Sequence, residues 1–133
     1  MSFQVHLTFA GECEAAFRFY ERVLGGSDLR TFRWGDVPGG TSGMPADWLV
    51  HAGLNLGAYE LMGADVAADQ YERPRGFYVY YAAATRTDAE RIFAALSDGG
   101  SVVMPLQQTF WSPCFGVLVD RFGVPWEVTA TAA

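Results

Sequence analysis

The sequence predicts an α+β fold built from two copies of a βαβββ module. Three observations lead to this prediction. Residues 3–9 alternate between apolar and polar side chains, and a segment of helical period follows them. The same succession returns from residue 76, and both helical segments stop at a double glycine, Gly25-Gly26 and Gly99-Gly100. Three strand-like segments then follow each helix.

The first module, residues 1–65, begins with a half-buried strand, FQVHLTF at 3–9. From Cys13 to Leu24 the apolar side chains recur with helical period, and Cys13 itself lies on the apolar stripe, where we expect an inert core thiol. A loop rich in glycine and proline at residues 35–47 is longer than a hairpin needs. The three strands after the helix are predicted at residues 28–34, 47–56 and 58–64.

The second module, residues 76–131, follows a polar linker at 66–75. Its first strand, GFYVYYAA at 76–83, is rich in aromatic and β-branched residues. Thr87-Asp88-Ala89-Glu90 has the pattern of a capping box that opens a helix. The two helices match at Ala15 and Ala89, and at Phe19 and Phe93, with an offset of 74 that indicates an internal duplication. The last three strands are predicted at residues 101–109, 113–119 and 124–130.

Composition excludes several functions. A chain of 133 residues is expected to form one domain. The net charge of −6 and pI near 4.7 argue against nucleic acid as a partner, because phosphate binding requires a basic face. No apolar run is long enough to cross a membrane, and the first residues lack the pattern of a secretory signal. With two cysteines only, we expect a cytoplasmic protein with free thiols.

Three segments resemble the vicinal oxygen chelate superfamily, which includes glyoxalase I, bleomycin-resistance proteins and extradiol dioxygenases, and within it the PhnB-like branch. They are LTFAGECEAAFRFYERVLGG (7–26), VHAGLNLGAYELMGAD (50–65) and QQTFWSPCFGVLVDRFGVPWEV (107–128). The resemblance implies a single glyoxalase-like domain over residues 1–133, with curled sheets around a cavity and helices outside. It also implies a small-molecule ligand on the concave side and a homodimer, which the aromatic excess favours.

Strand alternation selects the side chains that point away from the helices. In the first strand the apolar neighbours of His6 face the helix, so His6 faces away from it. In the segment LVHAGLNL, His51 and Asn55 face away from the helix for the same reason. Glu127 stands between Trp126 and Val128 in the last strand. Glu60 follows a glycine at a spacing close to that of Glu127, so we expect the two glutamates to be related by the pseudo-twofold axis of the repeat. The sequence therefore predicts that His6, Glu60 and Glu127 meet in one hollow.

The resemblance implies that His6, Glu60 and Glu127 are the ligands of a divalent metal (Zn, Mn, Ni or Fe). In glyoxalase-like members two such glutamates bind metal, and the spacing from Asp120 to Glu127 matches the second one. One departure counts against this set. The strand at 76–83, where such members usually supply a further ligand, contains no His, Asp, Glu or Cys.

Two functions stay open. The first is a metal-dependent lyase, isomerase or dioxygenase-type enzyme acting on a small oxygenated substrate, with Glu60 or Glu127 as the catalytic base. The second is a metal-free protein that binds and sequesters a small aromatic or cationic molecule, as the missing ligand, the aromatic content and the negative charge suggest. The predicted substrate-binding residues are His51, Asn55, Tyr78, Tyr80 and Trp111.

Overall fold

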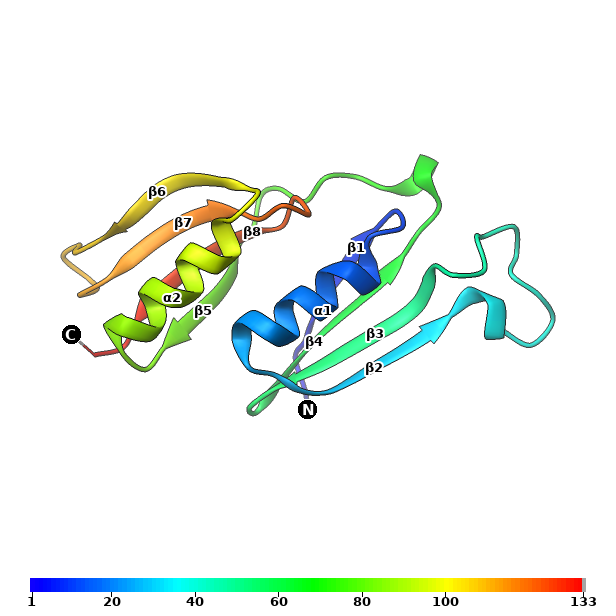
Figure 1. Ribbon diagram of the computed structural model, residues 1–133, viewed down its shortest axis with the longest axis horizontal. Helices are drawn as coiled ribbons and strands as arrows, with labels where there is room; N and C mark the ends of the chain where they lie inside the picture. Colours follow the sequence, from blue (N-terminus) through cyan, green and yellow to red (C-terminus); the bar gives the residue numbers. More distant parts are fainter. Residues whose placement is uncertain (133) are drawn as a thin grey trace. The chain divides into compact units, whose positions relative to one another are not determined.

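The computed structural model describes residues 1–132, so the predicted domain limit at residue 133 lies outside it. The chain divides into two compact units, Met1–Glu72 and the part from Arg73 onward. Each unit contains one four-stranded sheet and one α-helix in the order βαβββ (Figure 1). The predicted α+β class with two βαβββ modules is confirmed. Within the described residues no helix is long and apolar enough to span a membrane.

The first unit has a mixed sheet with α1 on one face (Figure 1). The strand order is β1-β4-β3-β2, with β1 parallel to β4 and the other neighbours antiparallel. Short 3-10 turns, Trp34–Asp36 and Ala68–Gln70, lie in the loop after β2 and in the predicted linker. The elements are β1 (Val5–Phe9), α1 (Cys13–Leu24), β2 (Ser27–Arg33), β3 (Leu49–Leu56) and β4 (Tyr59–Asp65).

Helix α1 forms the core of this unit because its apolar stripe packs directly on the sheet. Phe17 is fully buried, and a side chain added at Gly63 of β4 would place its Cβ 2.6 Å from the Phe17 ring. Cys13 is fully buried too, and burial, reinforced by Asp65 and Glu14, raises the pKa of its thiol. The expectation that Cys13 packs in the core is therefore confirmed. Gly25 ends the helix in the left-handed conformation (φ 71°), as predicted.

The second unit repeats the plan with the strand order β5-β8-β7-β6 and with β5 parallel to β8. Phe93 of α2 packs on β7 at Gly116, where a Cβ would lie 2.6 Å from its ring. In the first unit Phe17 likewise packs on a glycine, Gly63, although that glycine lies on β4, the counterpart of β8 rather than of β7. The elements are β5 (Val79–Ala83), α2 (Arg86–Ser97), β6 (Ser101–Gln107), β7 (Phe115–Val119) and β8 (Pro125–Ala130).

Details of the predicted second module need correction. The N-cap of α2 is Thr85, whose Oγ1 accepts a hydrogen bond from the Asp88 backbone N–H at 3.1 Å, so the helix begins two residues before the predicted capping box. The helix offset is also wrong by one residue. Ala15 is exposed whereas Ala89 is buried, and an offset of 73 aligns Ala16 with Ala89 and places all four buried residues of α2 opposite buried residues of α1.

Asp120 explains the motif Asp-x-Phe-Gly-x-Pro-Trp in structural terms. Its buried carboxylate accepts hydrogen bonds from the backbone N–H groups of Phe122 (2.8 Å) and Val124 (3.0 Å) through Oδ1. Its Oδ2 accepts from the indole Nε1 of Trp126 at 2.9 Å. Asp120 therefore fixes the turn from β7 to β8 and the start of the strand that carries Glu127.

Candidate functional site

The face of the first sheet opposite α1 carries most of the predicted polar side chains. Strand registers place His6 beside Met62, Met62 beside Gly53, and Gly53 beside Arg30, which makes one row across all four strands. The orientation of Gly53 defines the face, because a Cβ added there would point at the side chains of Arg30 and Glu60 rather than at the helix.

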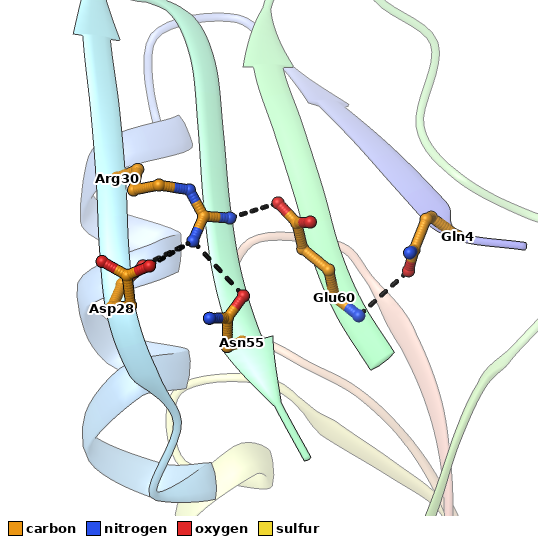
Figure 2. A network of polar contacts seen from close by, with 5 residues as sticks. All are labelled: Gln4, Asp28, Arg30, Asn55 and Glu60. Carbon is orange, nitrogen blue, oxygen red and sulfur yellow. Dashed lines mark hydrogen bonds and ion pairs between the residues drawn. The ribbon is translucent and has the colours of Figure 1, made fainter. Parts of the chain in front are cut away.

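Arg30 is the centre of a polar network on this face (Figure 2). Its Nη2 donates to Glu60 Oε1 across β3, and its Nη1 donates to Asp28 Oδ2 at 2.8 Å and to Asn55 Oδ1 at 3.3 Å. The backbone N–H of Glu60 donates to Gln4 Oε1 at 2.9 Å, which links the network to the segment before β1. One guanidinium thus joins two carboxylates and an amide from three neighbouring strands.

A bulge in β2 makes this arrangement possible. The pairing of β2 with β3 shifts between Ser27 and Arg30, and Asp28 within the bulge has φ 55°. Aspartate tolerates this left-handed conformation better than most residues, and the bend returns its carboxylate to Arg30. The hydrogen bond with Asp28 is the main cause that raises the pKa of Arg30, with Glu60 adding to it, so the guanidinium stays charged.

Sequence reasoning missed Arg30. The available signal was alternation in SDLRTFR, which separates Arg30 and Phe32 from Leu29 and Thr31. Alternation within one strand does not say which strands are neighbours, however. The side chain reaches Glu60 only because β2 pairs with β3, β3 pairs with β4, and Gly53 leaves the space between them open.

The histidines lie on the same face, as alternation predicts. His6 neighbours Met62 on β4, and His51 of β3 is half-buried and pairs with Phe32 of β2. His6 is exposed by its surface area, yet partial desolvation lowers its pKa from 6.5, and the nearby His51 lowers the pKa further. Both effects favour the neutral imidazole of His6 over the charged form. Asn55 belongs to the network of Arg30, while its role toward a substrate stays a prediction.

The metal that the superfamily implies does not fit this face well. Glu60 is bonded to a guanidinium that keeps its charge, and a divalent ion bound there would have to displace or approach a fixed cation. Within either unit, no three His, Cys, Asp or Glu side chains of residues 1–132 form a group that could hold a metal ion. Glu127 belongs to the other unit, so its meeting with His6 and Glu60 stays a prediction.

The two glutamates do not occupy equivalent positions in the repeat. β1 and β5 each have five residues, and their second residues, His6 and Tyr80, pair with Met62 and Glu127 respectively. Glu127 therefore corresponds to Met62. The prediction that a pseudo-twofold axis relates Glu60 to Glu127 is wrong. The strand β4 pairs with β1, and β8 pairs with β5, at different distances from the turns that precede β4 and β8.

The face of the second sheet opposite α2 is aromatic around one carboxylate. Tyr80, Glu127 and Val117 are neighbours in register across β5, β8 and β7. Because the Gly116 Cβ position points at Phe93 of α2, the adjacent Val117 and its partner Glu127 point to the opposite face. Tyr78 precedes β5 with the same parity as Tyr80, and both are exposed.

Trp111 lies at the same face, in the loop between β6 and β7. Its ring packs edge-on against the ring of Phe115 at 5.4 Å, and Phe115 has the same parity as Val117 in β7. The ring of Phe110 also packs edge-on against Trp111, with ring centroids 4.8 Å apart. The predicted residues Tyr78, Tyr80 and Trp111 thus belong to one unit, and His51 and Asn55 belong to the other.

Comparison with known proteins identifies the class. Residues 4–128 match the family model described as the Glyoxalase/Bleomycin resistance protein/Dioxygenase superfamily, and the chain belongs to this superfamily. Protein YjdN of Escherichia coli (strain K12) is 30% identical over 96% of this chain and 94% of its own length. The resemblance inferred from the three sequence segments is confirmed.

Solved structures agree with the family model. The crystal structure of protein PA1353 from Pseudomonas aeruginosa is 37% identical, with a TM-score of 0.90 over 100% of this chain and 99% of that one. The PhnB protein from Bacillus cereus is 24% identical, with a TM-score of 0.80 over 98% of this chain and all of that one, which shows a shared fold.

Proposed function

We propose that this chain is a small-molecule-binding protein that works without a metal. The observation that carries the proposal is the bond between Arg30 and Glu60. The sequence predicts Glu60 as both a metal ligand and a catalytic base, and a bound guanidinium competes for the same carboxylate in both roles. Because Asp28 and Glu60 both hold the Arg30 guanidinium in place, a divalent ion at Glu60 would have to compete with it, although one guanidinium neutralises only one of the two negative charges.

The two sheet faces offer recognition groups of different kinds. The first presents polar donors and acceptors, among them the neutral imidazole of His6 and the amide of Asn55. The second presents exposed aromatic rings around Glu127. Small-molecule sites usually consist of apolar and aromatic side chains with a few polar groups placed among them.

A thermal-shift screen tests the proposal. Protein treated with a chelator is mixed with a panel of neutral, cationic and anionic aromatic compounds, and the melting temperature is measured. A ligand that binds only the folded state stabilises it by RT ln(1 + [L]/Kd), so a true ligand raises the melting temperature in proportion to the logarithm of its excess concentration. If no compound raises the melting temperature unless metal is restored, the proposal is wrong.

A metal-dependent enzyme acting on a small oxygenated substrate is the second candidate. The favouring observation is that His6 and His51 lie on the same sheet face, where partial burial and the nearby His51 lower the pKa of His6 and so favour the neutral imidazole that binds metal. Titration of Zn, Mn, Ni or Fe salts into chelator-treated protein separates the candidates. A saturable rise in melting temperature that Glu127→Ala abolishes would favour the enzyme, with His6, Glu60 and Glu127 as ligands.

A further inference from the structure

We propose that the second unit recognises an organic cation with an apolar or aromatic body, and that Glu127 is the residue that selects its charge. This inference rests on the proposed metal-free binding function and names its ligand class. It is carried by the second sheet alone, and needs nothing from the polar network of Arg30.

Glu127 is a carboxylate without a counter-charge. It is half-buried in the middle of β8, and its side chain makes no hydrogen bond or ion pair with any residue of the described chain. Two of the arginines in the second unit are engaged elsewhere. Arg86 donates to the carbonyl oxygen of Pro113 at 2.7 Å, and Arg121 bonds to Asp98 at 3.1 Å.

A half-buried, unpaired carboxylate is costly, because it loses hydration and gains no partner in return. Glu60 shows the alternative in the same chain, since it is bonded to the Arg30 guanidinium, which it shares with Asp28. The corresponding arginine is absent from the row of Glu127, whose neighbours in register are Tyr80, Val117 and, one strand further, Met104. A positive charge that arrives with a ligand would fill this role.

The groups around Glu127 suit the rest of such a ligand. Tyr80 is 60% exposed directly beside Glu127, and Trp111 is 57% exposed over Phe115, which lies diagonally across from Glu127. Aromatic faces carry negative electrostatic potential and attract cations, tryptophan and tyrosine strongly among them. The net charge of −6 adds a general preference for positive ligands.

Three probes of similar size test the assignment: benzyltrimethylammonium, benzyl alcohol and phenylacetate, which are positive, neutral and negative. Each is titrated into the chelator-treated full chain while NMR follows the Trp111 indole and the backbone amides near Glu127. We expect saturable shifts with benzyltrimethylammonium, weaker binding of the alcohol, and no binding of phenylacetate.

Substitutions locate the site. Glu127→Gln keeps the shape and removes the charge, and we expect it to weaken benzyltrimethylammonium binding about fivefold or more. Tyr80→Ala should weaken it and Tyr80→Phe should not, because the ring provides the attraction. Glu90→Gln is the matched control, since Glu90 is exposed on α2, on the other side of the sheet. NMR spectra of each variant verify its fold.

The outcomes separate this inference from the proposed function. Equal affinity for the three probes, no binding of the cation, or a cation affinity that Glu127→Gln leaves unchanged would overturn the role of Glu127. Metal-free binding of another compound in the thermal-shift screen would still support the proposed function. Conversely, loss of all binding without metal would contradict the proposed function itself.

Discussion

Gly53 is the residue that allows Arg30 and Glu60 to meet. A Cβ at this position would lie 2.5 Å from both Arg30 Nη2 and Glu60 Oε1. Glycine therefore leaves the space above β3 in which the side chains of Arg30 on β2 and Glu60 on β4 form their ion pair. The pair turns a predicted metal ligand into part of a permanent network. An ion pair this accessible to water contributes little to folding, so we expect its removal to change ligand binding more than stability.

His6 gives a direct electrostatic prediction. Because the folded-state pKa of His6 is below the unfolded value of 6.5, the unfolded state binds more protons in the interval between the two. The contribution of His6 to stability is therefore fully present above pH 6.5 and is lost as pH falls through the folded-state pKa.

NMR titration of the His6 ring protons measures the effect. We expect a midpoint below 6.5, and an upward move of that midpoint in His51→Gln, which removes the second cause. Desolvation is the larger cause, so the midpoint of the variant should still lie below 6.5. A His6 midpoint at or above 6.5 in the wild-type protein would contradict this view of the first sheet.

Alternation within single strands placed His6, His51 and Asn55 on the correct face, because each strand has one buried side against a helix. It could not find Arg30, which acts across three strands. It also could not fix the register of Glu60 against Glu127, because that register depends on how β4 and β8 pair with β1 and β5.

Each helix touches its sheet through an aromatic ring that rests on a glycine. We expect Gly63→Ala and Gly116→Ala each to lower the free energy of unfolding by about 1–3 kcal/mol, because the new methyl group would overlap Phe17 or Phe93 in a packed core. Urea unfolding gives the values. Gly53→Ala is the matched control on the opposite face, where only mobile side-chain ends must move, and it should cost less. Equal losses in all three variants would refute the assignment of faces.

The turn between β7 and β8 depends on a single carboxylate. Asp120→Ala would leave two backbone N–H groups and the indole of Trp126 without this acceptor, so we expect a loss of about 3 kcal/mol in unfolding free energy. The control is Asp98→Ala, whose carboxylate is exposed in its pair with Arg121, and which should change stability very little. A loss after Asp120→Ala no larger than after Asp98→Ala would contradict this role.

The elements themselves were largely predictable from the sequence. All eight strands and both helices were expected, since aromatic and β-branched strands and a 3.6-residue stripe are strong local signals. The start of α2 was misplaced because Thr85 and Thr87 are both plausible caps, and the choice depends on where β5 ends at Ala83. Tertiary pairing decides this boundary, and local sequence does not.

For the assembly we propose a homodimer. The strand orders leave β1 and β2 at the edges of the first sheet and β5 and β6 at those of the second. β6 also exposes Val102 and Val103 in succession, and exposed apolar edges are often covered by a partner. Light scattering coupled to size exclusion should give twice 14.6 kDa at micromolar concentration. The mass of a single chain under these conditions would contradict the proposal.

Glu60 and Glu127 differ in the cation that is available to neutralise each carboxylate. Glu60 has a cation supplied by the chain itself, and Glu127 has none among the described residues. If one metal ion bound both Glu60 and Glu127, the positive charge of Arg30 would repel that ion at Glu60. Ligand binding without metal needs no rearrangement of this network.

Elemental analysis of the protein purified without chelator tests the central claim most directly. We predict far less than one equivalent of Zn, Mn, Ni or Fe per chain, with the same small content in Glu60→Ala and Glu127→Ala. One equivalent of metal in the wild-type protein that is lost in both variants would contradict the account.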